Sequence, residues 1–370
     1  MLLVGLTIYD GLQPSPQPSS GVAVGSALGG DDSVGYQRAY HPRPFTFPHD
    51  HGPHPEFRNE WWYVTGNLTD ATGRPFGYQL TIFRIALSPA MPPADSSWRA
   101  NQIYMGHFAL TDVANNRHHG FERFSRGALG LAGAQATPFR VWLEDWALTG
   151  AESDLFPLRI QAREGDLALD LTLEAGKPVV LQGNQGLSQK SAEPGNASYY
   201  YSYTRMPTQG TVSAGGQDFA VSGASWLDRE WSTSALGPDQ SGWDWFALQL
   251  EDGRDLMFYR LRSKKGGMDS FSKGVLVETD GQARRLRWND VELQPLGEWI
   301  SPKTRDRYPA GWRLRLPAEN LELTVTPKVA DQEMRLTVRY WEGAVAVSGR
   351  ASDRQVRGQG YLEMTRYEPR

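Results

Sequence analysis

The sequence predicts an all-β protein made of two barrel-like domains related by internal duplication. Its 39 Gly and 24 Pro suit many tight turns, and its 13 Trp, 15 Tyr and 14 Phe exceed what the cores of 370 residues need. Many short segments alternate apolar and polar residues, and no dozen consecutive residues show a convincing helical period. Residues 60–84 return in reduced form at 242–262, and such self-similarity at a long offset is typical of a duplicated domain.

The repeated unit is an aromatic β-hairpin. In each copy a tryptophan cluster opens an alternating strand, an Asp/Gly turn reverses the chain, and a second strand closes on an aromatic residue followed by Arg. The sequence aligns Trp62-Tyr63 with Trp245-Phe246, Asp70 with Asp252, and Phe83-Arg84 with Tyr259-Arg260. A second parallel aligns Trp226-Leu227-Asp228 with Tyr361-Leu362-Glu363. Each copy therefore begins and ends on a similar strand, so that its first and last strands could meet in a closed sheet.

The expected strands follow one another with turn signals between many of them. In chain order they are 61–69, 76–87, 102–112, 139–149, 157–163, 167–174, 198–206, 217–227, 243–251, 255–262, 274–279, 285–289, 312–316, 320–326, 334–341, 343–348 and 358–364. The turn signals are Thr72-Gly73, Asp252-Gly253, Asp280-Gly281 and Glu342-Gly343. Because residues 233–241 have the small-residue and Pro/Gly composition of a linker, we expect barrel domains at 36–235 and 236–370.

The N-terminal residues 1–35 are expected to precede the folded domains. The first eight, MLLVGLTI, are apolar but lack a basic flank and are too short to span a bilayer. Residues 10–35 have the Gly, Ser, Pro and Ala content of a flexible tether. We interpret the segment as a signal-peptide remnant with a linker; an ordinary flexible N-terminus is the alternative.

Composition and missing motifs narrow the functional classes. A net charge of −4 gives no electrostatic footprint for nucleic acid, and the absence of Cys excludes disulfides, thiolate nucleophiles and Cys-based zinc sites. The sequence contains no G-x-S-x-G elbow, P-loop or dinucleotide-binding glycine motif. Their absence argues against, without excluding, a serine hydrolase, an NTPase or a dinucleotide-dependent enzyme. We expect no cofactor.

Single polar residues complete otherwise apolar strand faces. Arg84 shares a face of strand 76–84 with Tyr78, and His107 shares a face of strand 102–110 with Met105. Such a residue is either a satisfied polar group in the core or a group that points into a ligand cavity. With the excess of Trp, the pattern predicts an extended apolar ligand (a lipid, polyene or isoprenoid) inside the first barrel; a structural protein with a filled core is the alternative. The expected ligand-binding residues are Trp61, Trp62, Tyr78, Arg84, His107, Trp226, Trp231, Trp245 and Tyr259.

Two charged triplets precede tryptophans. They are Arg58-Asn59-Glu60 before Trp61 and Asp228-Arg229-Glu230 before Trp231. One interpretation is an Arg–carboxylate network that locks the domain interface. The other is a general acid, Asp228 or Glu230, with a pKa raised by apolar walls, and with Trp226, Trp231 and Trp245 stabilising a cationic transition state. Because Arg229 paired with these carboxylates would lower their pKa, we expect binding rather than catalysis.

His49, His51 and His54 form a short histidine-rich run. An H-x-H-x-x-H spacing can supply zinc ligands, but this run lies in a Pro/Gly-rich approach to the first strand without an H-E-x-x-H helix. Short His-rich loops also occur without metal, and we expect no metal here.

Several long segments resemble the AttH/CrtC-type family, which is similar to the carotenoid 1,2-hydratases. These segments are FPHDHGPHPEFRNEWWYVTGNL (47–68), WLDREWS (226–232), GWDWFALQLEDGRDLMFYRLR (242–262), YWEGAVAVSG (340–349) and GQGYLEMTRY (358–367). The resemblance covers roughly residues 36–370 and implies two packed lipocalin-like barrels in a periplasmic or secreted protein. It also implies hydro-lyase or hydrolase-like chemistry on an apolar substrate. A further alternative is a structural accessory of an envelope lipid-transport ABC system. Membrane association is expected only through the N-terminus.

The resemblance has two departures at functional positions. A Tyr-x-Asp of the hydratases would fall near Tyr259-Arg260-Leu261, where the acid is missing. Where the carotenoid hydratases carry a D-H-N-W-G-like segment, this chain has Asp228-Arg229-Glu230-Trp231-Ser232. Asp228 and Trp231 are kept, but Arg229 replaces the histidine, and a permanently charged guanidinium does not donate a proton.

Overall fold

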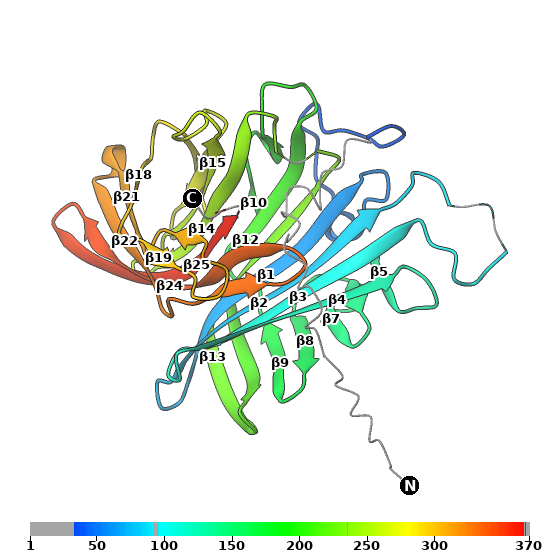
Figure 1. Ribbon diagram of the computed structural model, residues 1–370, viewed down its shortest axis with the longest axis horizontal. Coiled ribbons are helices and arrows are strands. Elements are labelled where there is room, and N and C mark those ends of the chain that lie inside the picture. Colours follow the sequence, from blue (N-terminus) through cyan, green and yellow to red (C-terminus); the bar gives the residue numbers. More distant parts are fainter. Residues whose placement is uncertain (1–32, 92, 94, 235, 366, 368–370) are drawn as a thin grey trace, which may run out of the picture.

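The computed structural model describes residues 33–370 except 92, 94, 235, 366 and 368–370. The predicted signal segment and tether therefore lie, up to residue 32, outside the described residues. The described chain forms two large antiparallel sheets with two short 3-10 helices, η1 (His49–His51) and η2 (Pro317–Glu319), and contains no α-helix (Figure 1). The predicted all-β class is confirmed.

The first sheet holds 13 strands. They are β1 (Asn59–Asp70), β2 (Pro75–Ala86), β3 (Gln102–Asp112), β4 (Arg117–Arg126), β5 (Ala132–Gln135), β6 (Arg140–Leu143), β7 (Trp146–Thr149), β8 (Leu158–Glu164), β9 (Leu167–Leu173), β10 (Val180–Leu181), β11 (Leu187–Gln189), β12 (Ala197–Ala214) and β13 (Gln217–Ser232).

The second sheet holds ten strands, and a two-stranded ribbon accompanies it. The sheet strands are β14 (Gln240–Leu250), β15 (Asp255–Ser263), β16 (Lys273–Val277), β17 (Ala283–Arg287), β18 (Glu292–Pro295), β21 (Trp312–Leu316), β22 (Leu321–Pro327), β23 (Glu333–Arg335), β24 (Arg339–Ala351) and β25 (Arg354–Thr365). The ribbon is β19 (Trp299–Ile300) with β20 (Arg307–Tyr308).

The strand order confirms the duplication. In the first sheet the path runs β4-β3-β2-β1-β13-β12-β9-β8, and in the second β17-β16-β15-β14-β25-β24-β22-β21. The first and last long strands of each copy pair with each other, β1 with β13 and β14 with β25. Pairing of the ends of a copy removes two exposed edges from its sheet, which is what a barrel-like closure requires.

At the first strand of each copy, β1 and β14, the structural equivalence of the two copies differs by one residue from the alignment made on the sequence. Tyr63 lies opposite Asp228, and Trp245 lies opposite Glu363. Since Asp228 and Glu363 are equivalent, Trp245 corresponds to Tyr63 and not to Trp62. A shift of one residue moves a side chain to the other face of a strand, so the distinction decides which aromatic rings meet.

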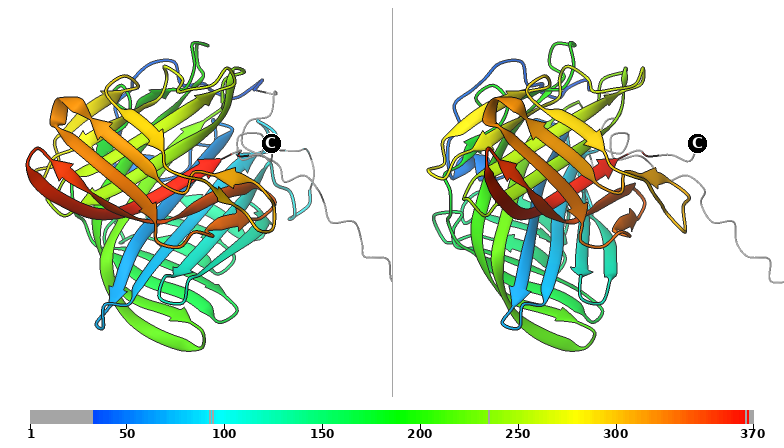
Figure 2. Two further views of the ribbon diagram at one scale, coloured as in Figure 1. Left: turned by 60° about the vertical axis from the view of Figure 1, so that its left-hand side comes forward. Right: turned by 90° about the vertical axis from the view of Figure 1, so that its left-hand side faces the viewer.

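Each sheet buries its own core, and the outer faces of the two sheets bury a third. One cluster fills the inside of the first sheet and includes Trp62, Tyr78 and Trp231. Another fills the second sheet and includes Trp312. A third cluster joins Tyr63 and other residues of the first sheet to residues of the second. The views in Figure 2 show the yellow to red strands of the second sheet lying across the blue and green strands of the first.

The contact between the sheets depends on small residues. A Cβ atom on Gly77 of β2 would lie 2.5 Å from the Cβ of Ala344 of β24. Hydrogen bonds also cross the contact: Asn67 donates to the carbonyl of Gly360 at 3.0 Å, and Thr111 donates to Gln332 at 2.9 Å. Strands β1 and β2 are therefore buried on both faces, which explains their nearly continuous burial.

Several predicted strands and turns need correction, among them 334–341, which is divided between β23 and β24. The predicted strand 139–149 is a tight hairpin, β6–β7, whose turn places Glu144 at φ 58°. The predicted turn at Glu342-Gly343 lies inside the continuous strand β24, because Gly343 there makes room for the side chain of Gln332. Strand β4 was not expected; most of its residues are half-buried, which weakens the alternation by which strands are recognised.

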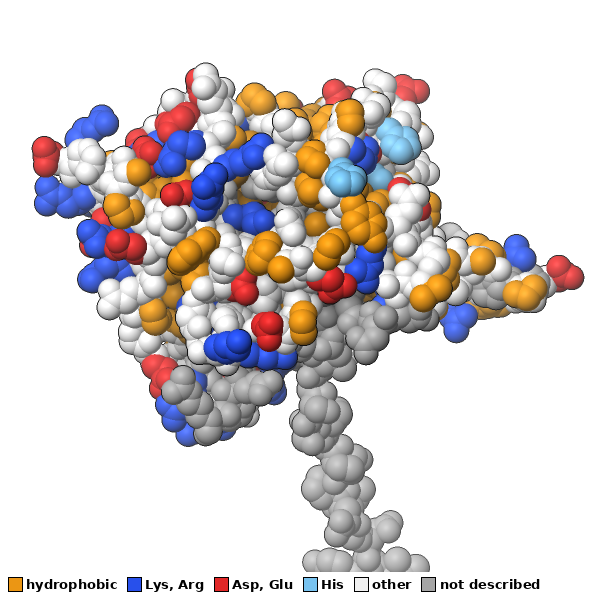
Figure 3. All heavy atoms as spheres, turned by 90° about the horizontal axis from the view of Figure 1, so that it is seen from above, with side chains coloured by type: hydrophobic (Ala, Val, Ile, Leu, Met, Phe, Trp, Pro, Cys, Tyr) orange, Lys and Arg blue, Asp and Glu red, His pale blue; other side chains and the backbone are white. Residues whose placement is uncertain are grey.

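The surface carries both charges. On the face shown in Figure 3, acidic and basic side chains are interspersed with small hydrophobic areas. No helix among the described residues is long and apolar enough to cross a bilayer.

Candidate functional site: a cavity between the two sheets

A cavity of about 130 Å³ lies between the outer faces of the two sheets. The first sheet and its loops line it with Trp61, Tyr63, Gln79, Thr81, Phe83, His107, Lys190, Tyr200, Asp228, Glu230 and Ser232. The second sheet and the connection before it contribute Ser234, Leu236, Trp243, Trp245, Tyr259, Leu261, Tyr340, Glu342 and Glu363. The sequence predicted a ligand inside the first barrel. That interior is instead filled by side chains, and the cavity lies outside it.

Strand periodicity explains which residues reach the cavity. The lining residues repeat at every second position, as Trp61 and Tyr63 do on β1 and Trp243 and Trp245 do on β14. Successive side chains of a strand point to opposite faces, so the residues between them enter the barrel interiors. Six predicted site residues therefore line the cavity: Trp61, His107, Asp228, Glu230, Trp245 and Tyr259. Five do not: Trp62, Tyr78, Arg84, Trp226 and Trp231.

Asp228 is held by three donors. Ser202 donates to its Oδ1 at 2.5 Å, Tyr200 donates to its Oδ2 at 2.5 Å, and the indole N–H of Trp226 donates to Oδ1 at 2.7 Å. Burial nevertheless raises the pKa of Asp228 to about 7, against the hydrogen bonds that favour its charged form. Trp226 thus supports the site from behind Asp228 without lining the cavity. Asp228 can take up or release a proton near neutral pH.

Glu230 forms an ion pair with Lys190. Lys190 Nζ lies 2.9 Å from Glu230 Oε1 and 4.4 Å from the ring centre of Tyr259. The hydroxyl of Ser198 also donates to Glu230. Burial opposes the charge of Lys190, but the carboxylate of Glu230 outweighs it and holds the pKa of Lys190 above its usual value. Glu230 is therefore a paired carboxylate, which suits an anionic or positioning role better than that of an acid.

Glu342 and Glu363 are a second pair of buried carboxyl groups. They lie directly opposite each other on β24 and β25, on the face that lines the cavity. Burial and the neighbouring carboxyl of Glu363 raise the pKa of Glu342 well above its usual range. Burial raises the pKa of Glu363 to about 8. Two carboxyl groups at adjacent cross-strand positions do not both ionise readily, so the pair retains a proton at neutral pH.

Hydroxyl groups surround this pair. Tyr63 of β1 donates a hydrogen bond to Glu342 across the sheet contact, and Tyr340 lines the cavity from the same face of β24 as Glu342. Tyr340 is also 2.7 Å from Nδ1 of His107, whose Nε2 is 3.1 Å from Glu122. In the cavity wall, His107 therefore connects Glu122 of the first sheet with Tyr340 of the second.

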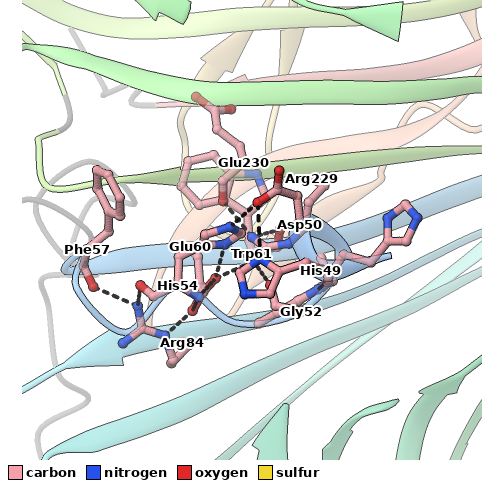
Figure 4. A network of polar contacts seen from close by, with 12 residues as sticks. His49, Asp50, Gly52, His54, Phe57, Glu60, Trp61, Arg84, Arg229 and Glu230 are labelled. Carbon is pink, nitrogen blue, oxygen red and sulfur yellow. Dashed lines mark hydrogen bonds and ion pairs between the residues drawn. The ribbon is translucent and has the colours of Figure 1, made fainter. Parts of the chain in front are cut away.

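Arg84 belongs to a separate network inside the first barrel (Figure 4). Glu60, fully buried, forms ion pairs with Arg84 and Arg229 and accepts from the backbone N–H of His54 at 3.0 Å. Burial raises the pKa of Glu60, but the two guanidinium groups outweigh it and hold this pKa well below its usual range. The predicted Arg–carboxylate network exists, but it ties β1, β2 and β13 together within one sheet and not across the domain interface.

Arg229 forms no ion pair with the carboxylate of Asp228 or Glu230, although it donates to the backbone carbonyl of Glu230 at 3.1 Å. Its guanidinium lies 4.0 Å from the ring centre of Trp62 and bonds to Glu60 inside the barrel, whereas the two neighbouring acids face the cavity. The alternation of β13 separates them. The objection that Arg229 would lower the pKa of Asp228 is thereby removed.

Three predicted ligand-binding residues pack in the first core. The hydroxyl of Tyr78 lies 2.5 Å from Ser225, and the indole N–H of Trp62 donates to the carbonyl of His51 at 2.7 Å. Trp231 stacks on the ring of His54, with 3.8 Å between ring centres and 5° between planes. Tyr78 and Trp62 are satisfied core side chains, whereas the buried indole N–H of Trp231 has no hydrogen-bond partner among the described residues.

The histidine run is built into the same interior network. His49, Asp50 and His54 come close enough to hold a metal, whereas His51 turns away to bond Tyr201 at 2.6 Å. Arg229 donates to His54 Nδ1 at 3.1 Å, so Nε2 carries the proton and donates to Asp50 Oδ1 at 3.0 Å. A protonated Nε2 has no lone pair for a metal, and the geometry fits a hydrogen-bond network.

Sequence reasoning missed several lining residues, above all Glu342 and Glu363. Glu342 was assigned to a turn because Gly follows it, although it lies in a continuous strand. Glu363 had a usable signal, since the repeat aligns it with Asp228. Because equivalent positions of the two copies face the same contact between the sheets, this alignment would have placed Asp228 and Glu363 together.

Comparison with known proteins gives a family and a set of related folds. Residues 38–367 match the family model described as AttH-like. A structure from Nitrosomonas europaea assigned as AttH is 33% identical, covers 90% of this chain and 99% of its own chain, and has a TM-score of 0.80. Kievitone hydratase from Nectria haematococca is 16% identical over 90% of this chain and 97% of its own, with a TM-score of 0.68. CghA is 13% identical over 92% and 96%, with a TM-score of 0.55.

The last two similarities concern the fold alone, because identity is below the level that carries function. None of the curated proteins matches this chain in sequence. The family model spans nearly the whole described chain, and the Nitrosomonas structure agrees with it in sequence and in fold. The chain belongs to the AttH-like family.

Proposed function

We propose that this chain is a hydratase, which protonates a carbon–carbon double bond of an apolar substrate in the inter-sheet cavity and adds water to the resulting cation. The observation that carries the proposal is the Glu342–Glu363 pair, a buried acid that faces an aromatic cavity. Burial and the closeness of the two carboxyl groups raise the pKa values of this pair, so the pair still holds a proton at pH 7. A double bond is a weak base, so its protonation needs a group that still holds its proton at working pH.

The cavity walls suit a cationic intermediate. Trp61, Trp243 and Trp245 line the cavity together with Tyr63 and Tyr259. Indole and phenol faces attract positive charge, and in a desolvated site this attraction reaches about 2 kcal/mol for one ring. The neutral substrate gains much less from the same faces, so the rings stabilise the transition state more than the bound substrate.

Asp228 is suited to accept the proton of the incoming water. Its oxygens are oriented by Ser202, Tyr200 and Trp226, and its pKa of about 7 leaves a carboxylate available at neutral pH. The step is balanced in atoms and charge. One proton passes from the glutamate pair to carbon, water forms the new C–O bond, and the proton that water loses passes to Asp228. The predicted general acid Asp228 thus becomes the base in this proposal.

The cavity size limits what reacts there. A cavity of about 130 Å³ is comparable with the roughly 150 Å³ cavities that bind a benzene-sized molecule. An isoprenoid or polyene would therefore place one end in the cavity and leave the rest toward the opening. The similarity in fold to kievitone hydratase supports a hydration, because the same two-sheet scaffold carries that activity by name. The periplasmic location and the ABC-transporter partner stay proposals drawn from the family resemblance alone.

The experiment offers the protein kievitone and a set of acyclic isoprenoids and polyenes in H₂¹⁸O, and measures product mass. We expect one substrate class to gain one labelled water. Glu342→Gln and Glu363→Gln should each lower turnover by about 10² to 10⁴, the usual contribution of a general acid, with ligand quenching of tryptophan fluorescence retained. The matched control is Glu251→Gln, an exposed acid next to β14, which should keep full activity.

Two outcomes would contradict the proposal. Full turnover in both glutamine variants would remove the acid from the mechanism. Tight binding across the set without incorporation of ¹⁸O would instead favour the alternative, an apolar-ligand carrier. Asp228→Asn distinguishes the base from a structural role, since an unchanged melting temperature with lost turnover supports the base.

A further inference from the structure

We infer that one end of the first sheet docks on the surface of a lipid bilayer, from which an apolar substrate passes to the cavity. This docking end consists of the described residues of loop 87–101 between β2 and β3, the end of β4, the turn 127–131 that follows it, and Val34 beside the loop. The inference goes beyond the proposed function, because it concerns where the protein meets its substrate and does not depend on the chemistry in the cavity.

Exposed apolar side chains are concentrated at the docking end. Among the described residues, nine large hydrophobic side chains are exposed, and six of them lie here. These six are Val34, Leu87, Met91, Trp98, Phe124 and Leu129. Leaving such a group of side chains in water is unfavourable, and on a folded domain it marks a contact surface.

Backbone hydrogen bonds hold the segments of the docking end together. The amide of Leu87 donates to the carbonyl of Asn101 at 2.7 Å, so the two ends of the loop are paired. The amide of Gly127 donates to the carbonyl of Gln102 at 3.2 Å, which places the turn after β4 beside the same end of β3. The loop projects beyond the ends of the strands, in cyan in Figure 1. Its apolar side chains can therefore reach a flat partner before the rest of the body does.

Two features favour a bilayer as this partner. Trp98 is 57% exposed, and an indole ring prefers the boundary between lipid headgroups and hydrocarbon, where its ring is covered and its N–H stays hydrated. The chain before Ser33 also joins the body here, because a Cβ atom on Gly35 would lie 2.7 Å from Pro89 of the loop. A lipid contact of the apolar residues 1–8 would hold this same end of the protein at the membrane.

An apolar strip connects the docking end with the cavity. On the outer face of β2, Phe83 lines the cavity, and Ile85 and Leu87 follow at alternate positions. Exposure rises along this face, from 8% at Phe83 through the half-buried Ile85 to 60% at Leu87. Ile103 of β3 lies opposite Ile85 and is also half-buried. A substrate that moves along this strip from the lipid to the cavity keeps one side against hydrocarbon.

The attraction is apolar and not electrostatic. The chain has a net charge of −4, which does not draw it to anionic lipid. Binding to an uncharged bilayer then depends on the apolar area that enters the interface. We therefore expect docking on phosphatidylcholine vesicles, with an affinity that high salt does not reduce.

The absence of cysteine from the chain allows a direct test of orientation. A single introduced cysteine carries an environment-sensitive fluorescent label at Met91→Cys or Leu129→Cys of the docking end. The matched control is Trp288→Cys, at another exposed large side chain, directly after β17 of the second sheet. On addition of phosphatidylcholine vesicles, we expect the emission to shift to shorter wavelength for the first two labels and to stay unchanged for the control.

Serine substitutions measure the strength of docking. Leu87→Ser and Trp98→Ser should each weaken vesicle binding in a sedimentation assay by at least about tenfold, because each withdraws one large apolar side chain from the lipid. Trp288→Ser should bind as the unmodified protein does. All three positions are exposed, so the fold does not depend on them.

Three outcomes would overturn the inference. The first is a failure of the unmodified protein to bind the vesicles. The second is a shift at Trp288→Cys as large as the shift at Met91→Cys. The third is vesicle binding that survives both serine substitutions, which would assign the contact to residues 1–32 or to another surface. None of these results affects the proposed hydratase, because the assay with H₂¹⁸O contains no vesicles.

Discussion

Replacement of Glu363 by glutamine should make the protein more stable at alkaline pH. Burial raises the pKa of Glu363 from 4.5 to about 8, so between these pH values the native state holds a proton that the unfolded chain has released. The free energy of unfolding therefore falls as pH rises through this window. Glutamine has nearly the same shape and no charge to bury, and it removes this fall.

The structure gives the size of the effect. Each pH unit between the unfolded and folded pKa is worth about 1.4 kcal/mol, so the rise at Glu363 corresponds to at most about 5 kcal/mol across the window. Penetration of water and the remaining titration of Glu342 reduce this value. The stabilisation of the variant relative to the unmodified protein should grow by a few kcal/mol between pH 5 and pH 9.

The assay is urea unfolding followed by tryptophan fluorescence at pH 5, 7 and 9, for the unmodified protein, Glu363→Gln and the exposed control Glu251→Gln. The control should show a pH-independent difference close to zero. A difference for Glu363→Gln that stays constant within about 0.5 kcal/mol would mean that Glu363 titrates as an ordinary surface acid. The acid of the proposed mechanism would then be lost as well.

Three further outcomes follow from the buried contacts. Arg229→Met leaves Glu60 with one guanidinium in the first barrel and should cost about 3–5 kcal/mol in urea unfolding, and a cost below about 1 kcal/mol would contradict the role of this ion pair. Burial raises the pKa of Glu60, but Arg84 and Arg229 outweigh it and lower this pKa, so the carboxylate stabilises the fold at pH values above its unfolded pKa of 4.5. This stabilisation is lost as the pH falls. The variant Glu60→Gln should be less stable overall, but its melting temperature should depend less on pH in the acid range. Gly77→Val places a side chain against Ala344 and should cost about 1–3 kcal/mol, which Ala344→Gly in the same chain should partly restore.

The repeat and the alternation were visible in the chain itself. Tryptophan-rich strands separated by Asp-Gly and Thr-Gly turns predicted an all-β fold in two related parts, because these signals are local. Asp228, Glu230 and Trp245 were also found by sequence, since charged residues beside tryptophans are unusual. Local signals do not determine which face of each strand lies on the outside of its barrel. Both faces of β1 and β2 are buried, so their sequences show no difference in polarity between the two faces.

Tertiary structure decided where the chemistry lies. The sequence determined that acids and aromatic rings alternate on paired strands, and the packing of one sheet across the other determined that Asp228, Glu342 and Glu363 share one cavity. Residues adjacent in sequence were separated, as Arg229 was from Asp228, because alternate side chains of a strand enter different cores. Residues far apart, such as His107 and Tyr340, were joined because two sheets pack with their outer faces together. Only this contact removes water from the glutamate pair, and desolvation is what raises its pKa.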